Sequence, residues 1–100
     1  MDTLTSQQRK YLRGLAHHLD PIVLIGRHGV TETVIRTTSQ ALDAHELVKV
    51  RFVDRKDEKK EMIEELAARA DCHVAGVVGH TAVLYRQQRD PAKRRIQLSE

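Results

Sequence analysis

Residues 47–52 read Leu47-Val48-Lys49-Val50-Arg51-Phe52. From Val48 onward, apolar and basic side chains alternate, and successive side chains of a strand point to opposite faces of a sheet. We therefore expect a strand whose apolar side chains enter the core while Lys49 and Arg51 face water. A strand with one solvated face favours a two-layer fold over a sheet that is covered on both faces.

Three other stretches favour strands. A continuous apolar run, Ile22–Ile25, is typical of a strand that is buried on both faces. Further along the chain, His73–Val78 and Thr81–Arg86 are rich in β-forming residues and flank Gly79-His80, a pair suited to a two-residue hairpin turn. We expect four strands, of which the last two are antiparallel.

Three further segments have apolar residues at helical spacing. The first starts with Thr5 or Ser6 as its cap and stops before Pro21, because a residue that precedes proline is pushed out of the helical conformation. The second follows a Thr31 cap, and the third covers residues 57–70. The side chains expected to face the core are Tyr11, Leu12, Leu15 and Leu19 in the first helix, Val30, Val34, Ile35, Thr38, Ala41 and Leu42 in the second, and Met62, Ile63, Leu66, Ala67 and Ala70 in the third.

The expected order of elements is helix, strand, helix, strand, helix, strand, strand. Strands that alternate with helices and end in a hairpin give an α/β (α+β) fold with a four-stranded mixed sheet. Such a sheet is parallel where a helix crosses over and antiparallel at the hairpin. A chain of 100 residues has the length of a single domain. From Gln87 onward the sequence is polar and basic, so we expect residues 87–100 to form a basic tail that is ordered only in part.

The composition limits the class of protein. The one cysteine, Cys72, excludes an intramolecular disulfide and a cysteine-rich zinc ribbon. The first residues do not resemble a secretory signal, and no apolar run approaches the ~20 residues that span a bilayer. We therefore expect a cytoplasmic protein without a membrane partner. The six histidines match no known spacing of metal ligands, so we expect neither a metal nor another cofactor.

The net charge of +3 is unevenly distributed. Residues 54–71 hold seven of the fourteen acidic residues but only five of the seventeen Lys and Arg residues. The rest of the surface is therefore basic, and a basic surface attracts polyanions, of which nucleic acid is the first candidate.

A glycine-rich loop, Gly26-Arg27-His28-Gly29, connects the first expected strand to the second helix. Glycine tolerates positive φ and the close approach of another backbone, and the free N–H groups at a helix start favour an anion. Arg27 adds a permanent forked cation and His28 a second donor. KH domains clamp nucleic-acid phosphates with a Gly-x-x-G loop of this kind, without reading the bases. The same pattern also forms ordinary tight turns, so both interpretations stay open.

Four stretches stand in the order and spacing of a known family: Leu12-Arg13-Gly14-Leu15-Ala16-His17, Pro21-Ile22-Val23-Leu24-Ile25-Gly26 with Gly29, His45-Glu46-Leu47-Val48-Lys49-Val50, and Gly79-His80-Thr81-Ala82-Val83-Leu84-Tyr85-Arg86. Over residues 4–86 the chain resembles the CRM domain (chloroplast RNA splicing and ribosome maturation) in its stand-alone bacterial form, the YhbY family. The resemblance implies a fold similar to the C-terminal domain of translation initiation factor three. It also implies RNA binding through the Gly-x-x-G loop and the adjoining basic surface, and association with precursors of the large ribosomal subunit. Plant relatives tend to have lysine and glycine between the loop glycines, where this chain has Arg27 and His28.

The leading interpretation is an RNA-binding protein that grips the phosphate backbone and is not an enzyme. We expect a monomer that binds ribosomal RNA or large-subunit precursors and has no small-molecule substrate. The expected RNA contacts are Gly26, Arg27, His28, Gly29, Lys10, Arg13, Lys49, Arg51 and Arg86. Basic residues outside the loop are equally typical of an ordinary solvated surface.

Two other hypotheses belong to different classes of protein. The first is a protein-interaction adaptor on ribosomal precursors that makes no direct RNA contact. The second is a small phosphate-handling enzyme, which the sequence disfavours because it lacks a P-loop, a paired-carboxylate metal site and a nucleophile beside a base. Cys72 precedes an apolar strand, so we expect a buried, inert thiol there.

Overall fold

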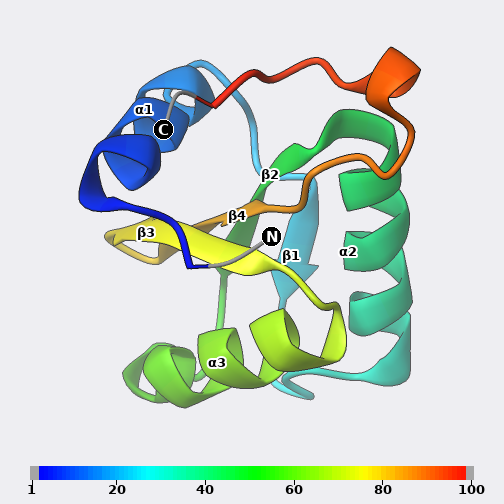
Figure 1. Ribbon diagram of the computed structural model, residues 1–100. Coiled ribbons are helices and arrows are strands. Elements are labelled where there is room, and N and C mark those ends of the chain that lie inside the picture. Colours follow the sequence, from blue (N-terminus) through cyan, green and yellow to red (C-terminus); the bar gives the residue numbers. More distant parts are fainter. Residues whose placement is uncertain (1–2, 99–100) are drawn as a thin grey trace.

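The computed structural model describes residues 3–98, and its helices and strands follow the expected order (Figure 1). The elements are α1 (Ser6–Ala16), β1 (Val23–Ile25), α2 (Glu32–His45), β2 (Leu47–Phe52), α3 (Lys59–Arg69), β3 (His73–Val78) and β4 (Thr81–Tyr85), with short 3-10 turns η1 (Lys56–Glu58) and η2 (Pro91–Lys93). The bounds of β2 and β3 are those expected from the sequence.

The four strands form one mixed sheet in the order β1-β2-β4-β3. β1 and β2 are parallel, and α2 makes the crossover between them. β4 is antiparallel to both of its neighbours, β2 and β3, and the Gly79-His80 turn joins β3 to β4. The α/β fold with a four-stranded mixed sheet is therefore confirmed.

Two hydrophobic clusters lie on the two faces of this sheet. The larger one packs α2 and α3 against the face formed by Val48, Val50 and Phe52, which are at most 1% exposed. The smaller one packs α1 and the tail against the other face, around Leu47 and Tyr85. The expected two layers are the sheet and the α2–α3 layer, and α1 adds a partial cover on the second face (Figure 1). Lys49 and Arg51 lie on that second face, where Lys49 is half-buried and Arg51 is exposed.

The two expected threonine caps both begin helices. Thr5 forms a capping box with Gln8: the Gln8 N–H donates to Thr5 Oγ1 (3.1 Å), and the Thr5 N–H donates to Gln8 Oε1 (2.9 Å). Thr31 Oγ1 accepts from the Val34 N–H at 3.1 Å and starts α2 directly after the glycine loop.

The expected buried face of the first helix was correct for Leu12 but wrong for Tyr11, Leu15 and Leu19. The helix ends at Ala16, and Tyr11, Leu15 and Leu19 are 48%, 39% and 39% exposed. The buried side chains of α1 are the expected Leu12 and, one turn later, Ala16, both 0% exposed. The physical reason is the partner surface: α1 packs mainly against β3, whose small residues at positions 75 and 76 admit only a narrow helix face.

The expectation that the Ile22–Ile25 run is buried on both faces was also wrong. β1 is an edge strand, and only Val23 and Ile25 enter the core beneath α2. Ile22 is 49% exposed and Leu24 is 59% exposed, because α1 does not extend over this edge of the sheet.

The tail is held by a buried carboxylate. Glu46 is 1% exposed and has φ of +63°, and its carboxylate accepts hydrogen bonds from three tail amides: Gln88 (2.9 Å), Arg95 (2.5 Å) and Ile96 (3.1 Å). The tail then covers the smaller cluster with Ile96 and Leu98. The expected tail is therefore fixed to the domain as far as residue 98, and its last two residues lie outside the described part of the chain.

Candidate functional site

The glycine loop forms a tight turn between β1 and α2. The Gly29 N–H donates to the Gly26 carbonyl at 3.0 Å, and the Thr31 N–H donates to the Gly29 carbonyl at 3.1 Å. Gly29 has φ of +68°, a conformation that glycine adopts without the strain that a side chain would bring. The turn places Arg27 and His28 at its tip, where both residues are exposed.

The tip of the loop carries unused hydrogen-bond donors. Within residues 3–98, no hydrogen bond or ion pair engages the side chains of Arg27 or His28, or their backbone N–H groups. The N-terminus of α2 lies directly behind these groups, and its dipole adds positive potential. The acidic residue of its first turn, Glu32, is paired with Arg69 of α3, which offsets its charge.

Arg55 supports the loop through a hydrogen bond to its backbone, a role that the sequence did not predict. Its Nη1 donates to the Arg27 carbonyl at 3.3 Å, and its Nε donates to Glu58 Oε2 at 3.1 Å. The hydrogen bond with Glu58 raises the pKa of Arg55 and lowers the pKa of Glu58. A Cβ atom added to Gly29 would lie 2.9 Å from Arg55 Nη1, so Gly29 also leaves space for this support. The sequence offers no local signal for a contact between residues 28 positions apart.

The exposed part of the sheet face that carries Arg51 lies at the same end of the molecule as the glycine loop. Leu24, Arg51, Thr81 and Val78 are paired in register and form one row across all four strands. β1 and β2 both end at this side of the row, where the Val53 N–H donates to the Ile25 carbonyl at 3.0 Å. The structure therefore brings the predicted Arg51 to the same end of the sheet as the glycine loop.

The two predicted α1 residues differ from each other. Lys10 is exposed on the helix, whereas Arg13 lies against β3: its Nη1 donates to the Ala75 carbonyl at 3.0 Å, and its stem covers Gly76. A Cβ atom on Gly76 would lie 2.4 Å from Arg13 Cδ. Arg13 thus helps to attach α1 to the sheet, and the structure does not bring Lys10 to the loop.

Arg86 is not brought to the loop either, because its guanidinium is bound inside the domain. Nη1 donates to the Ala70 carbonyl at 2.6 Å, while Nη2 donates to the Ser39 carbonyl at 2.7 Å and to Asp43 Oδ1 at 2.8 Å. The side chain is 22% exposed. Arg86 therefore ties β4 to α2 and to the end of α3, and we leave it out of the candidate surface.

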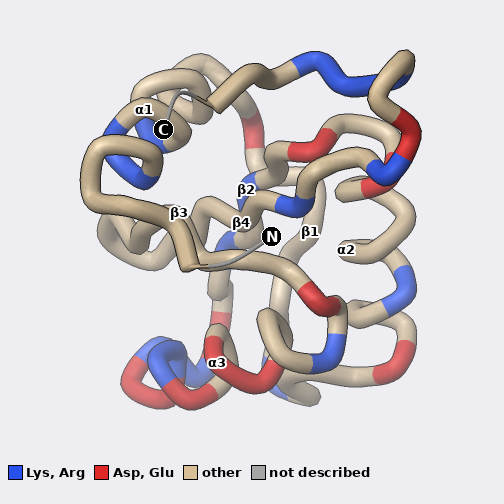
Figure 2. The backbone as a smooth tube through the Cα atoms, viewed as in Figure 1, with Lys and Arg blue, Asp and Glu red and all other residues tan. Residues whose placement is uncertain are grey.

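Acidic and basic residues are mixed along α3, while basic ones predominate in the tail beyond β4 (Figure 2). Among residues 3–98 no helix combines the length and apolar character that crossing a bilayer requires. Over the same residues, no three His, Cys, Asp or Glu side chains are grouped as metal ligands would be. Burial raises the pKa of the Cys72 thiol to about 11, which agrees with the inert thiol expected there.

Comparison with known proteins identifies relatives of the whole domain. The family model of the CRS1/YhbY (CRM) domain matches residues 4–86. A Haemophilus influenzae protein named "RNA-binding protein" is 42% identical over 88 residues, which cover 86% of this chain and 88% of the relative. A Bacillus subtilis protein named "Probable RNA-binding protein" is 34% identical, with 87% and 92% covered. The solution structure of a hypothetical Staphylococcus aureus protein matches with a TM-score of 0.79 and 34% identity, and the match covers 95% of this chain and 100% of that one.

These relatives carry RNA-binding names and no enzyme names, in agreement with the expectation that the chain is not an enzyme. The family match extends over the glycine loop, the sheet and all three helices. The resemblance that the four sequence stretches indicated is thus confirmed, and the chain belongs to the CRS1/YhbY (CRM) domain family.

Proposed function

We propose that this protein binds RNA and grips its phosphate backbone with the loop Gly26–Gly29. The observation that carries the proposal is the loop tip, where the exposed Arg27 and the unused backbone N–H groups of Arg27 and His28 lie beside the N-terminus of α2. Hydrogen-bond donors and positive potential in one exposed place suit a phosphate group. The RNA-binding names of the relatives support RNA as the polyanion.

The two loop glycines support this proposal in different ways. Gly29 is required by the fold, because its φ is +68° and Arg55 lies where a side chain would be. Gly26 has no such requirement: its φ is not positive, and a Cβ atom there would meet nothing within 4 Å. The space beside Gly26 is open, so a ligand could approach the backbone there. A phosphate group can come closer to the backbone of a glycine than to that of a residue with a side chain.

The cellular role that we propose is assistance in the assembly of the large ribosomal subunit, as the family resemblance implies. The loop contacts phosphates and not base edges, so it would not by itself select a sequence. Selection would then come from the shape of the folded RNA and from the adjoining surface around Arg51 and Lys49.

The glycines provide a matched pair of variants. Gly26→Ala should leave the free energy of unfolding unchanged but weaken binding to in vitro transcribed large-subunit ribosomal RNA about tenfold, through loss of close phosphate contact. Gly29→Ala should lower the free energy of unfolding by about 1–2 kcal/mol, because a left-handed conformation is unfavourable for alanine. Urea denaturation and fluorescence anisotropy measure the two quantities. A Gly26→Ala protein that is folded and binds RNA like the wild type would count against the loop.

One observation favours the adaptor hypothesis. Leu15, Leu19, Ile22 and Ile96 line an apolar groove away from the loop, and the first three are 39–49% exposed. Exposed apolar surface of this kind suits a protein partner. The purified protein separates the two functions: an adaptor without RNA contact should show no salt-sensitive binding to ribosomal RNA in the absence of other proteins, whereas the proposed function requires it.

A further inference from the structure

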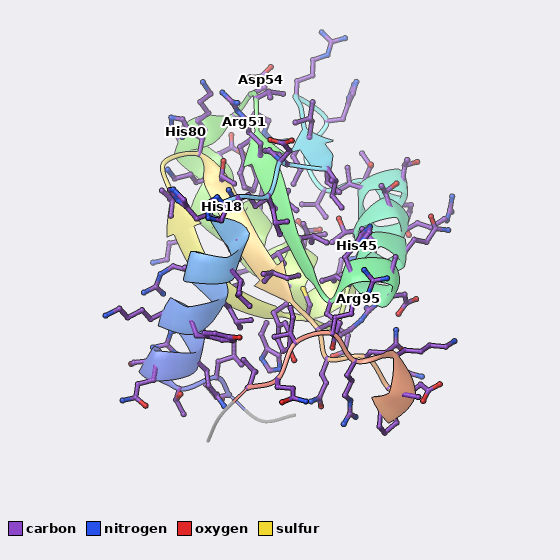
Figure 3. All side chains as sticks on the ribbon, turned by 90° about the horizontal axis from the view of Figure 1, so that it is seen from above. His18, His45, Arg51, Asp54, His80 and Arg95 are labelled. Carbon is purple, nitrogen blue, oxygen red and sulfur yellow. The ribbon has the colours of Figure 1, made fainter. Side chains whose placement is uncertain are left out.

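The β3–β4 hairpin lies at the same end of the sheet as the glycine loop. The Phe52 N–H donates to the His80 carbonyl at 2.8 Å, so the hairpin turn adjoins the last residue of β2, which in turn pairs with Ile25 of β1. Figure 3 shows His80, Arg51 and Asp54 at this end, with His45 and Arg95 at the opposite end. The hairpin therefore extends the surface that begins at the loop.

Several cations converge on this hairpin from different elements. Lys59, the first residue of α3, donates from Nζ to the Gly79 carbonyl at 2.6 Å, and its Nζ lies 3.4 Å from His80 Nδ1. An ammonium group has three donors, so Lys59 keeps at least one donor for a ligand. Lys56 in η1 and Arg51 in β2 are close enough to act on the His80 ring.

The charged neighbours of His80 act on its pKa in one direction. Partial desolvation lowers the pKa of His80, and the cations of Lys59, Lys56 and Arg51 lower it further. Of the acidic residues in the adjoining segment, Glu58 is hydrogen-bonded to Arg55. The charged groups that shift the pKa of His80 are all cations.

We infer that Lys56, Lys59 and His80 form a second phosphate-binding site, which takes another phosphate of the RNA chain that the glycine loop holds. The inference rests on the proposed function and adds residues that neither the loop motif nor the family resemblance assigned. Two phosphate sites at one end of the sheet would fix the direction of the RNA across this end, with Arg51 between them. His80 is mostly neutral near pH 7.5, so a substitution that places a permanent cation at position 80 adds positive charge to this site.

The first test uses the double variant Lys56→Ala with His80→Ala, which leaves Lys59 in place to hold the hairpin. The variant should bind in vitro transcribed large-subunit ribosomal RNA on the order of tenfold more weakly, and the slope of log affinity against log salt should decrease by about one. Its urea midpoint should match the wild type, since both residues are exposed. The control is Arg36→Ala with His45→Ala, a matched pair on α2, which should bind like the wild type.

The outcomes separate the two proposals. Wild-type affinity of the hairpin variant, together with weak binding by Arg27→Glu, would overturn the second site and leave the loop standing. Wild-type affinity of both variants would overturn the loop and the hairpin site together. Weak binding by the hairpin variant alone would support phosphate binding at the hairpin but contradict the loop, and the hairpin would then act by itself and not as a second site.

A second measurement uses the charge of residue 80 directly. His80→Lys places a permanent cation where the histidine is mostly uncharged at pH 7.5, so its RNA affinity should exceed that of the wild type several-fold. His80→Ala should bind more weakly than the wild type at pH 6, where more of the histidine is protonated. If His80→Lys bound no better than His80→Ala, the second site would be overturned.

Discussion

Replacing Arg86 with alanine should lower the free energy of unfolding by about 2–3 kcal/mol. The substitution leaves the Ala70 and Ser39 carbonyls without their donor and releases Asp43, so three elements lose a shared contact. Arg86→Lys should recover little of this loss, because one ammonium group cannot match the forked guanidinium. Urea denaturation followed by circular dichroism measures the change.

Arg89→Ala is the matched control for this prediction. Arg89 is exposed in the tail, so its loss should change the free energy of unfolding by less than about 0.5 kcal/mol. Under conditions where the Arg86→Ala protein is folded, its RNA affinity should equal that of the wild type. A stable Arg86→Ala protein with weakened RNA binding would return Arg86 to the interface that the sequence suggested.

Arg27→Glu should reduce RNA affinity by at least about tenfold, and by more at low salt, because it places an anion where the backbone phosphate binds. The free energy of unfolding should not change, since the side chain is exposed and takes part in no hydrogen bond or ion pair within residues 3–98. Fluorescence anisotropy with large-subunit ribosomal RNA over a series of salt concentrations measures both the affinity and its slope.

The control for this charge reversal is Arg36→Glu on the exposed side of α2, which changes the net charge of the protein equally. Its RNA affinity should decrease much less than that of Arg27→Glu. Equal losses for the two variants would show that RNA senses only the total charge, and the loop would then have no special role.

Local patterns in the sequence predicted the elements well. The alternation in residues 47–52 predicted both the bounds of β2 and the faces of Val50 and Arg51, because side-chain direction in a strand has a period of two. Thr31 predicted the start of α2 and therefore the position of the loop that precedes it. These features depend on neighbours within a few residues, which a single sequence contains.

Features that depend on distant contacts could not be predicted in this way. The buried face of α1 is selected by small residues of β3, and the exposure of Leu24 follows from the edge position of β1. Glu46 reads as an ordinary charged residue, yet it holds tail amides more than 40 positions away. The roles of Arg86 and Arg55 likewise depend on tertiary contacts. The sequence predicted Arg86 as an RNA contact although its guanidinium is bound inside the domain, and it gave no sign that Arg55 supports the loop.

The most direct test of the central claim is crosslinking of the protein to RNA in living cells, with identification of both the attached RNA and the crosslinked peptide. The proposed function predicts that the peptide contains residues 26–29 and that the RNA is large-subunit ribosomal RNA or its precursor. Crosslinks confined to the basic tail, or no RNA attached at all, would contradict it.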